Sequence, residues 1–141
     1  MKKRILVLLI TWVALALGAS WAGAADAYHY IQAKDLNDRL GAGSPMIIVD
    51  ICTKEQFAKG HVKGSIETNA YPVKTDEEKA RLAEVLPKLK ASADDVIVVC
   101  PKGGGGAKNT VDYYKANGID EKRLLILEKG MTEWPYATEK K

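Results

Sequence analysis

The sequence is poor in the residues that build metal centres and disulfide frameworks. Among 141 residues it has only two cysteines, Cys52 and Cys100, and two histidines, His29 and His61. None of them shows the Cys-x-x-Cys pairing that zinc sites use. We therefore expect no metal and no other cofactor. Two cysteines in an oxidising compartment do often form one structural disulfide, so that pairing stays open.

The sequence also lacks an excess of charge once its first residues are set aside. Three of the 21 basic residues are Lys2, Lys3 and Arg4, and none of the 18 acidic residues precedes position 25. The remaining chain therefore has 18 residues of each sign. This balance gives no electrostatic reason to expect nucleic acid or a membrane surface as a partner.

The first 24 residues have the three parts of a secretory signal peptide. A basic start is followed by an uncharged apolar run at residues 5–18 and then by small residues that fit a cleavage site, at 22–24. The run is shorter than the roughly 20 residues of a membrane-spanning helix. We predict a signal peptide at 1–24, one domain at 25–141, and a periplasmic or secreted protein. An uncleaved N-terminal anchor is the alternative.

The rest of the chain alternates strand-like and helix-like segments. Short β-branched runs between turn residues predict buried strands at residues 46–51, 95–100 and 124–127, with a shorter strand near Ile66. Helices are predicted at residues 33–40, from Thr53 onward, at 76–89 and at 108–117. Strands separated by helices predict an α/β fold of three layers, with a parallel sheet covered by helices on both faces.

Local signals refine the boundaries of these helices. Thr53 and Gln56 form a capping box at the start of one helix. Pro87 should kink or split the helix at 76–89, because proline removes a backbone hydrogen bond. Gly118 should end the last helix.

Cys100 ends the strongest predicted strand and begins the most informative segment of the chain. The residues after it are Pro101, Lys102, Gly103, Gly104, Gly105, Gly106, Ala107 and Lys108. Four successive glycines lose much conformational entropy on folding, so their presence in a folded domain indicates a structural or functional requirement. Their N–H groups can turn inward as an anion-binding nest, toward which the next helix also points its N-terminus. This loop should stabilise a thiolate at Cys100, and the two lysines could add positive charge.

Other polar residues fall near the same edge of the predicted sheet. Asp50 ends the strand at 46–51, and Cys52 follows two residues later. Parallel sheets bind ligands beyond the carboxyl ends of their strands, so Asp50, Cys52 and Cys100 are expected near one another. His61 follows Gly60 in a loop and is expected to be a structural hydrogen-bonding residue.

Three segments, in order, resemble the rhodanese (sulfurtransferase) domain family. The first joins residues 47–50 (IIVD), 55–57 (EQF) and 60–66 (GHVKGSI), the second is Cys100 with its glycine loop, and the third is residues 127–135 (LEKGMTEWP). The resemblance covers nearly all of residues 25–141 and implies a single parallel-sheet domain. It also implies that the Cys100 thiolate takes sulfur from a donor such as thiosulfate or polysulfide. The resulting persulfide would pass its outer sulfur to an acceptor such as cyanide, sulfite or another thiol.

The sequence departs from the family pattern at two arginines. The family usually has arginine two residues after the strand aspartate, where this chain has Cys52, and another in the loop, where this chain has glycines. The related dual-specificity phosphatase and arsenate reductase branch needs arginine at the sixth residue after the cysteine, which here is Gly106. Phosphatase chemistry is therefore disfavoured. Thiosulfate would need Lys102 or Lys108 as its cation.

We therefore predict a sulfurtransferase or sulfur carrier whose partners are a small sulfur-containing donor and a thiol or anion acceptor. Cys52 either traps Cys100 as a disulfide or resolves its persulfide, or it stays an unpaired, partly buried cysteine. Two alternatives remain for the whole protein. One is a non-catalytic module that binds an anion or a partner peptide in the loop. The other is a thiol-disulfide redox protein that uses Cys52 and Cys100.

Overall fold

The computed structural model describes residues 28–141. The predicted signal peptide at 1–24 lies outside the described residues. Within the described part of the chain, every helix is too short or too polar to cross a bilayer.

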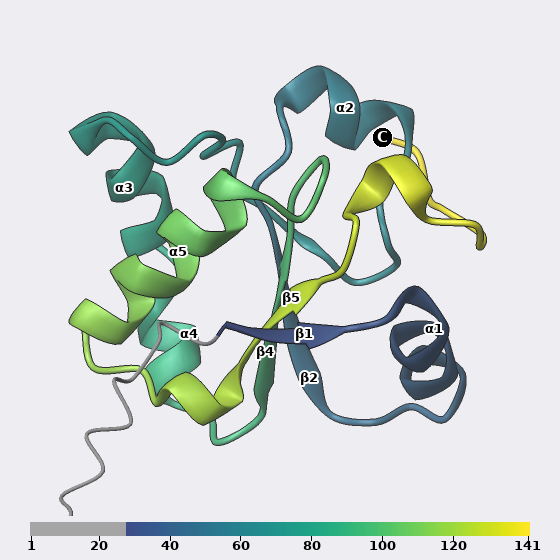
Figure 1. Ribbon diagram of the computed structural model, residues 1–141, viewed down its shortest axis with the longest axis horizontal. Helices are drawn as coiled ribbons and strands as arrows, with labels where there is room; N and C mark the ends of the chain where they lie inside the picture. Colours follow the sequence, from purple (N-terminus) through teal and green to yellow (C-terminus); the bar gives the residue numbers. More distant parts are fainter. Residues whose placement is uncertain (1–27) are drawn as a thin grey trace, which may run out of the picture.

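A five-stranded parallel sheet forms the centre of the domain (Figure 1). Its strands are β1 (His29–Ile31), β2 (Met46–Asp50), β3 (Ile66–Glu67), β4 (Asp95–Val99) and β5 (Leu124–Leu127). Their spatial order is β1-β5-β4-β2-β3. Strands β2 and β4 lie inside the sheet and are buried along almost their whole length, which is why their sequences are continuous apolar runs.

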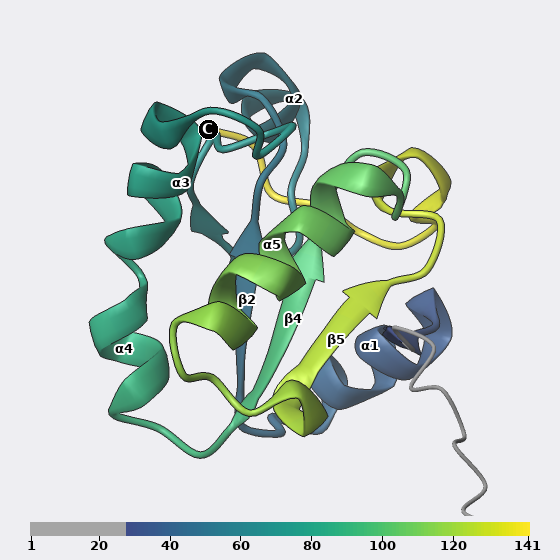
Figure 2. The ribbon, with the colours of Figure 1, turned by 60° about the vertical axis from the view of Figure 1, so that its left-hand side comes forward.

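Helices cover both faces of the sheet, as the sequence predicts (Figures 1 and 2). The helices are α1 (Ala33–Gly41), α2 (Lys54–Lys59), α3 (Asp76–Ala83), α4 (Leu86–Lys90) and α5 (Gly105–Ala116), with 3₁₀ turns η1 (Glu121–Arg123) and η2 (Met131–Glu133). Leu82, Leu89 and Tyr114 bring α3, α4 and α5 into one core cluster with β2 and β4. Leu36 of α1 and Met131 of η2 pack in a second cluster with the alternate residues of the same strands. The three-layer α/β prediction is confirmed.

Two local predictions about helices are confirmed. The Thr53 hydroxyl accepts a hydrogen bond from the Gln56 N–H, and the Gln56 side chain accepts one from the Thr53 N–H, which completes the capping box of α2. The predicted helix at 76–89 is split, because α3 ends at Ala83 and α4 begins at Leu86 with Pro87 in its first turn. Proline is tolerated there, because the N–H groups in the first turn of a helix have no intrahelical acceptor and the missing N–H of proline therefore costs no hydrogen bond.

The prediction missed the start of one helix and the whole of one strand. Helix α5 begins at Gly105 rather than at residue 108, so Gly105 and Gly106 belong to its first turn. Strand β1 was not predicted, because two of its three residues are exposed and it forms only by pairing with β5 at the edge of the sheet.

Candidate active site

Cys100 lies directly after β4, at the carboxyl edge of the sheet. Its side chain is 1% exposed and packs in the same core cluster as Ile51 and Ala107. The backbone N–H of Gly103 donates a hydrogen bond to Sγ of Cys100 at 2.9 Å. The loop therefore turns back on its own cysteine, and a main-chain donor meets the sulfur, which favours negative charge there.

The four loop glycines do not share one role. Gly103 has φ +71°, and a Cβ on it would lie 2.8 Å from the Leu127 carbonyl oxygen. A Cβ on Gly106 would lie 2.7 Å from the Tyr71 ring. In contrast, Gly104 and Gly105 have open space where a Cβ would stand. Close packing therefore requires glycine only at the first and last of the four positions.

The N-terminus of α5 offers further donors beside the loop. Its N-cap is Gly104, which has no side chain to accept a hydrogen bond from the first turn. Helices α2 and α3, in contrast, are capped by Thr53 and Thr75. Because the first N–H groups of a helix have no intrahelical partner, those of α5 remain available to an anion held at the loop.

The segment after β5 holds the loop from the other side. The Met131 N–H donates to the Cys100 carbonyl oxygen at 3.0 Å. Both the N–H and the hydroxyl of Thr132 donate to the Pro101 carbonyl oxygen, at 2.9 and 2.6 Å. Gly130 makes this close approach possible. Residues 127–135 were part of the family resemblance, but no role was assigned to them from the sequence. Their place in the third family segment is the signal that could have indicated a role at the site.

The two lysines of the loop segment have different surroundings. Lys102 is exposed. The ammonium of Lys108 lies 5.6 Å from the centre of the Tyr28 ring, a cation–π distance. The Tyr28 hydroxyl in turn donates to the Asp112 carboxylate at 3.0 Å. Because Asp112 is one helical turn after Lys108, this face of α5 holds the Lys108 ammonium over Tyr28, the residue before β1.

Asp50 is a buried carboxyl group with only one satisfied oxygen. Its side chain is 1% exposed, and Oδ1 accepts a hydrogen bond from the Cys52 N–H at 2.8 Å. Oδ2 has no hydrogen-bond partner among the described residues. Burial raises the pKa of Asp50 above its ordinary value of 3.8, although the Cys52 amide acts in the opposite direction. The carboxylate is thus penalised in the folded protein.

Asp50→Asn is expected to stabilise the folded protein at neutral pH by on the order of 1 kcal/mol. The amide keeps an oxygen for the Cys52 N–H and removes the buried charge. The folded-state pKa of Asp50 is raised, so wild-type stability falls as pH rises from about 4 through that raised value. The difference between the two proteins should therefore grow between pH 4 and pH 7, as measured by urea unfolding. The exposed Glu84, changed to glutamine, is the control. A destabilised Asp50→Asn at pH 7 would show that an unseen partner compensates the charge.

The two cysteines are free and lie in different surroundings. Cys100 packs with the cluster under α5, whereas Cys52 lines a hollow with Met131 and Trp134, which pack against the opposite cluster. Burial, and then the neighbouring Asp50 carboxylate, raise the pKa of the Cys52 thiol far above its ordinary value. A protonated thiol is a poor nucleophile toward Cys100. In this structure Cys52 is the unpaired, buried cysteine of the second alternative.

His61 joins the C-terminal segment to the end of α2. It is 8% exposed, stacks on the Phe57 ring with centroids 3.8 Å apart, and donates from Nδ1 to the Phe57 carbonyl oxygen at 2.9 Å. Its backbone exchanges two hydrogen bonds of 2.9 Å with Glu139. These contacts tie His61 to α2 and to the C-terminal segment.

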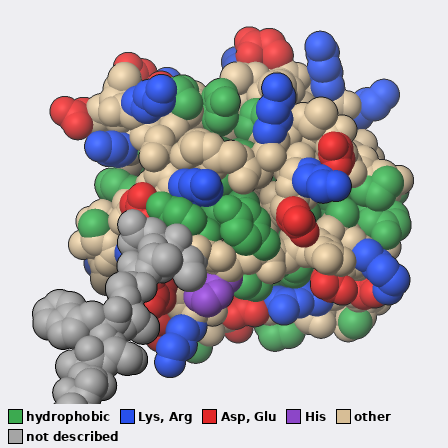
Figure 3. All heavy atoms as spheres, in the orientation of Figure 1, with side chains coloured by type: hydrophobic (Ala, Val, Ile, Leu, Met, Phe, Trp, Pro, Cys, Tyr) green, Lys and Arg blue, Asp and Glu red, His purple; other side chains and the backbone are tan. Residues whose placement is uncertain are grey.

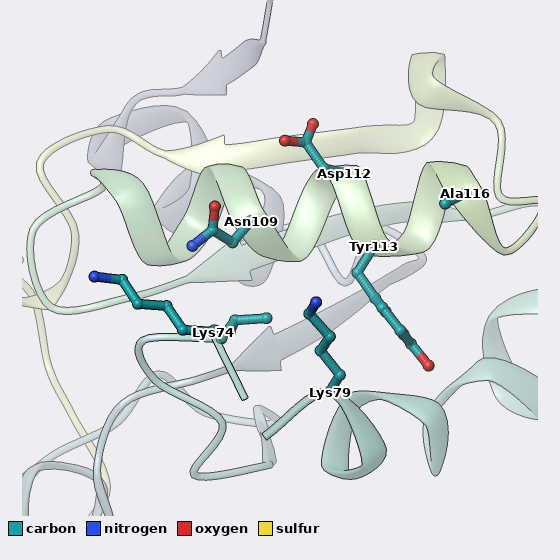
Figure 4. A pocket seen from close by; sticks show the side chains of 7 residues that line it. Lys74, Lys79, Asn109, Asp112, Tyr113 and Ala116 are labelled. Atoms are coloured by element: carbon teal, nitrogen blue, oxygen red, sulfur yellow. The ribbon is translucent and has the colours of Figure 1, made fainter. Parts of the chain in front are cut away.

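One hollow borders the loop, and a second lies farther along α5. One, of about 290 Å³, lies between α2, Pro101, η2 and the C-terminal segment, and Cys52 is part of its wall. The other, of about 460 Å³, lies between the start of α3 and α5 and is lined by Lys74, Lys79, Asn109 and Tyr113 among others (Figure 4). Within residues 28–141, no three His, Cys, Asp or Glu side chains come together as metal ligands would.

Comparison with known proteins gives a consistent result. The sequence profile described as the Rhodanese-like domain matches residues 32–137. Among curated proteins, none matches the sequence. Among solved structures, a rhodanese-like domain protein from Staphylococcus aureus is 26% identical, with a TM-score of 0.58 over 80% of this chain and 98% of that chain.

Two further structures extend the comparison to known enzymes. Thiosulfate sulfurtransferase from Pseudomonas aeruginosa is 21% identical, with a TM-score of 0.62, and the match covers 81% of this chain but only 20% of the enzyme. The As-Sb reductase from Leishmania major is 14% identical, with a TM-score of 0.59 and 77% of each chain covered. At these identities the two likenesses show a shared fold.

Proposed function

The chain belongs to the rhodanese-like domain family, and we propose that it is a sulfurtransferase or sulfur carrier that works through a persulfide on Cys100. The observation that carries the proposal is the hydrogen bond from the Gly103 N–H to Sγ of Cys100, beside the uncapped N-terminus of α5. Main-chain donors at the sulfur can stabilise negative charge on it, and the anionic sulfur is the nucleophile that sulfur transfer needs.

The proposed reaction has two steps, and Cys100 is unchanged at the end. In the first, the thiolate attacks the outer sulfur of a donor; a sulfur–sulfur bond to Cys100 forms, the donor's own sulfur–sulfur bond breaks, and its electron pair leaves with the remainder. Thiosulfate would leave as sulfite, and a thiol persulfide as a thiolate. In the second step, an acceptor thiolate or cyanide attacks the outer sulfur, and the Cys100 thiolate leaves. The loop N–H groups would stabilise the anionic forms in both steps.

The proposal also covers the partners of the protein and the compartment in which it acts. Positive and negative side chains are interspersed on the face shown in Figure 3, in keeping with the balanced counts for residues 25–141. Such a surface supports small sulfur donors and acceptors rather than nucleic acid as partners. The N-terminal segment supports export to the periplasm or the medium, where the mature domain would act without membrane attachment.

The test is direct detection of the persulfide. The full chain, purified and reduced, is incubated with thiosulfate, with tetrasulfide or with glutathione persulfide, and peptides are then analysed by mass spectrometry without reduction. We expect the mass of one added sulfur atom on the peptide that contains Cys100, and its loss when cyanide is added, with release of thiocyanate. Failure of Cys100 to gain sulfur from all three donors would reject the proposal.

A further inference from the structure

We infer that the Tyr71 ring occupies the place of a cationic anchor in the Cys100 loop, and that the site therefore selects persulfide and polysulfide donors over thiosulfate. The inference rests on the proposed function, because it concerns the donor of the same cysteine. Its structural part, the competition between the Tyr71 ring and a side chain at position 106, can be tested without any sulfur transfer.

Tyr71 is one of two large apolar side chains that the described part of the protein leaves exposed, with 41% of its surface accessible. Its ring nevertheless contacts the loop. A Cβ built on Gly106 would lie 2.7 Å from Cδ2 and 2.9 Å from Cε2 of this ring, distances that real Cβ atoms do not adopt. The ring therefore fills the space into which any side chain at position 106 would project.

The backbone around Tyr71 is tied on two sides. Its N–H donates to the Ile51 carbonyl oxygen at 2.9 Å, which fixes it to the end of β2. The side-chain amide of Asn109 on α5 (labelled in Figure 4) donates to the carbonyl oxygen of Pro72 at 3.2 Å. Because both β2 and α5 hold this segment, the backbone that carries the ring stays beside Gly106, and a side chain at position 106 could be accommodated only if the ring turned away.

This packing accounts for the absence of arginine at the sixth position after the cysteine. A guanidinium at position 106 would need the space that the Tyr71 ring fills. The nearest lysine in sequence, Lys108, is held over Tyr28 instead. A ligand at the loop thus meets main-chain N–H groups beside the Tyr71 ring, and position 106 itself supplies no guanidinium.

The uncharged Tyr71 ring discriminates between sulfur donors of different charge. Thiosulfate carries two negative charges, and the uncharged ring supplies no cation to balance them where an arginine at position 106 would have stood. The outer sulfur of a persulfide or polysulfide is polarisable and carries at most one charge, and sulfur makes favourable contacts with aromatic rings. With a thiol persulfide the balance is simple: the Cys100 thiolate takes the outer sulfur together with its proton, and the donor leaves as a thiolate. With thiosulfate, sulfite leaves and the Cys100 persulfide is formed as an anion.

Donor preference is measured as the single-turnover rate of Cys100 persulfide formation, with glutathione persulfide and with thiosulfate at equal concentrations. We expect the wild-type protein to react at least about tenfold faster with the persulfide. Tyr71→Ala should reduce this preference about tenfold. Tyr30→Ala is the matched control, because Tyr30 is 45% exposed on β1 and does not contact the loop. A preference that survives Tyr71→Ala unchanged, or a wild-type protein that prefers thiosulfate, overturns the inference.

A double-mutant cycle tests the packing itself, in a Cys100→Ser background where no transfer occurs. Gly106→Arg alone should not improve thiosulfate binding, because the Tyr71 ring blocks the new side chain. Tyr71→Ala with Gly106→Arg should bind thiosulfate about tenfold more tightly than Tyr71→Ala alone, as measured by calorimetry. Equal binding by Gly106→Arg with and without Tyr71 overturns the inference. If the wild-type protein formed no persulfide at all, the proposed function would be overturned instead. The binding cycle would still test the role of Tyr71, because it does not depend on sulfur transfer.

Discussion

Replacing Cys100 with serine is expected to abolish sulfur transfer, by about a thousandfold or more, while leaving the protein folded. A hydroxyl is a far weaker nucleophile than a thiolate and is not ionised at neutral pH, so the first bond to sulfur does not form. The serine oxygen still accepts from the Gly103 N–H, although at a greater distance than the 2.9 Å of the sulfur. The buried hydroxyl in an apolar cluster should lower the unfolding free energy by roughly 1–3 kcal/mol, which a domain of this size tolerates.

The same variant separates the proposed function from a binding module. If the loop only holds an anion or a peptide, Cys100→Ser binds its ligand as before, and the wild-type protein shows no transfer to lose. Cys52→Ala is the comparison that assigns the chemistry to one cysteine, because Cys52 is also buried and has its own surroundings. Retention of transfer in Cys52→Ala, together with its loss in Cys100→Ser, is the expected pair of results. Equal loss in both would favour the redox alternative.

The sequence predicts those parts of this structure that local patterns determine. Strands β2, β4 and β5 are buried runs of apolar residues, and their short length between turn residues is enough to identify them. The capping box at Thr53 and the interruption at Pro87 depend only on residues within one turn. The position of Cys100 after a strand and before glycines follows from the same patterns.

Contacts between distant segments could not be predicted in this way. Strand β1 has no apolar pattern of its own and exists because β5 offers an edge. The cation–π contact of Lys108 depends on that same edge, since it places Tyr28 beside α5. The Tyr71 ring reaches Gly106 across 35 positions of sequence, and only the fold brings the two together. Sequence reasoning therefore located the loop correctly but could not tell which side chains surround it.

Gly130→Ala is expected to be the most damaging of the glycine substitutions near the site. Gly130 has φ +62° and ψ −160°, a conformation that is almost restricted to glycine and costs a side-chain-bearing residue about 1–3 kcal/mol. The new Cβ would also overlap the Cys100 carbonyl oxygen and lie 2.6 Å from the Lys102 nitrogen. The loop and the segment after β5 would have to separate, with loss of the bond from the Met131 N–H to the Cys100 carbonyl.

The combined effect should lower the unfolding free energy by about 3 kcal/mol or more, measured by urea denaturation, and should slow persulfide formation at Cys100. Gly105→Ala, a glycine on the Cys100 side of this contact, is the matched control. It has open space at its Cβ position and lies in the first turn of α5, where alanine favours the helix, so its stability should be unchanged or slightly increased. If Gly130→Ala and Gly105→Ala had equal unfolding free energies, the segment after β5 would not clamp the loop. A folded Gly130→Ala protein with slowed transfer would show that this clamp positions the sulfur as well as stabilising the domain, because the substitution changes no group that touches the donor.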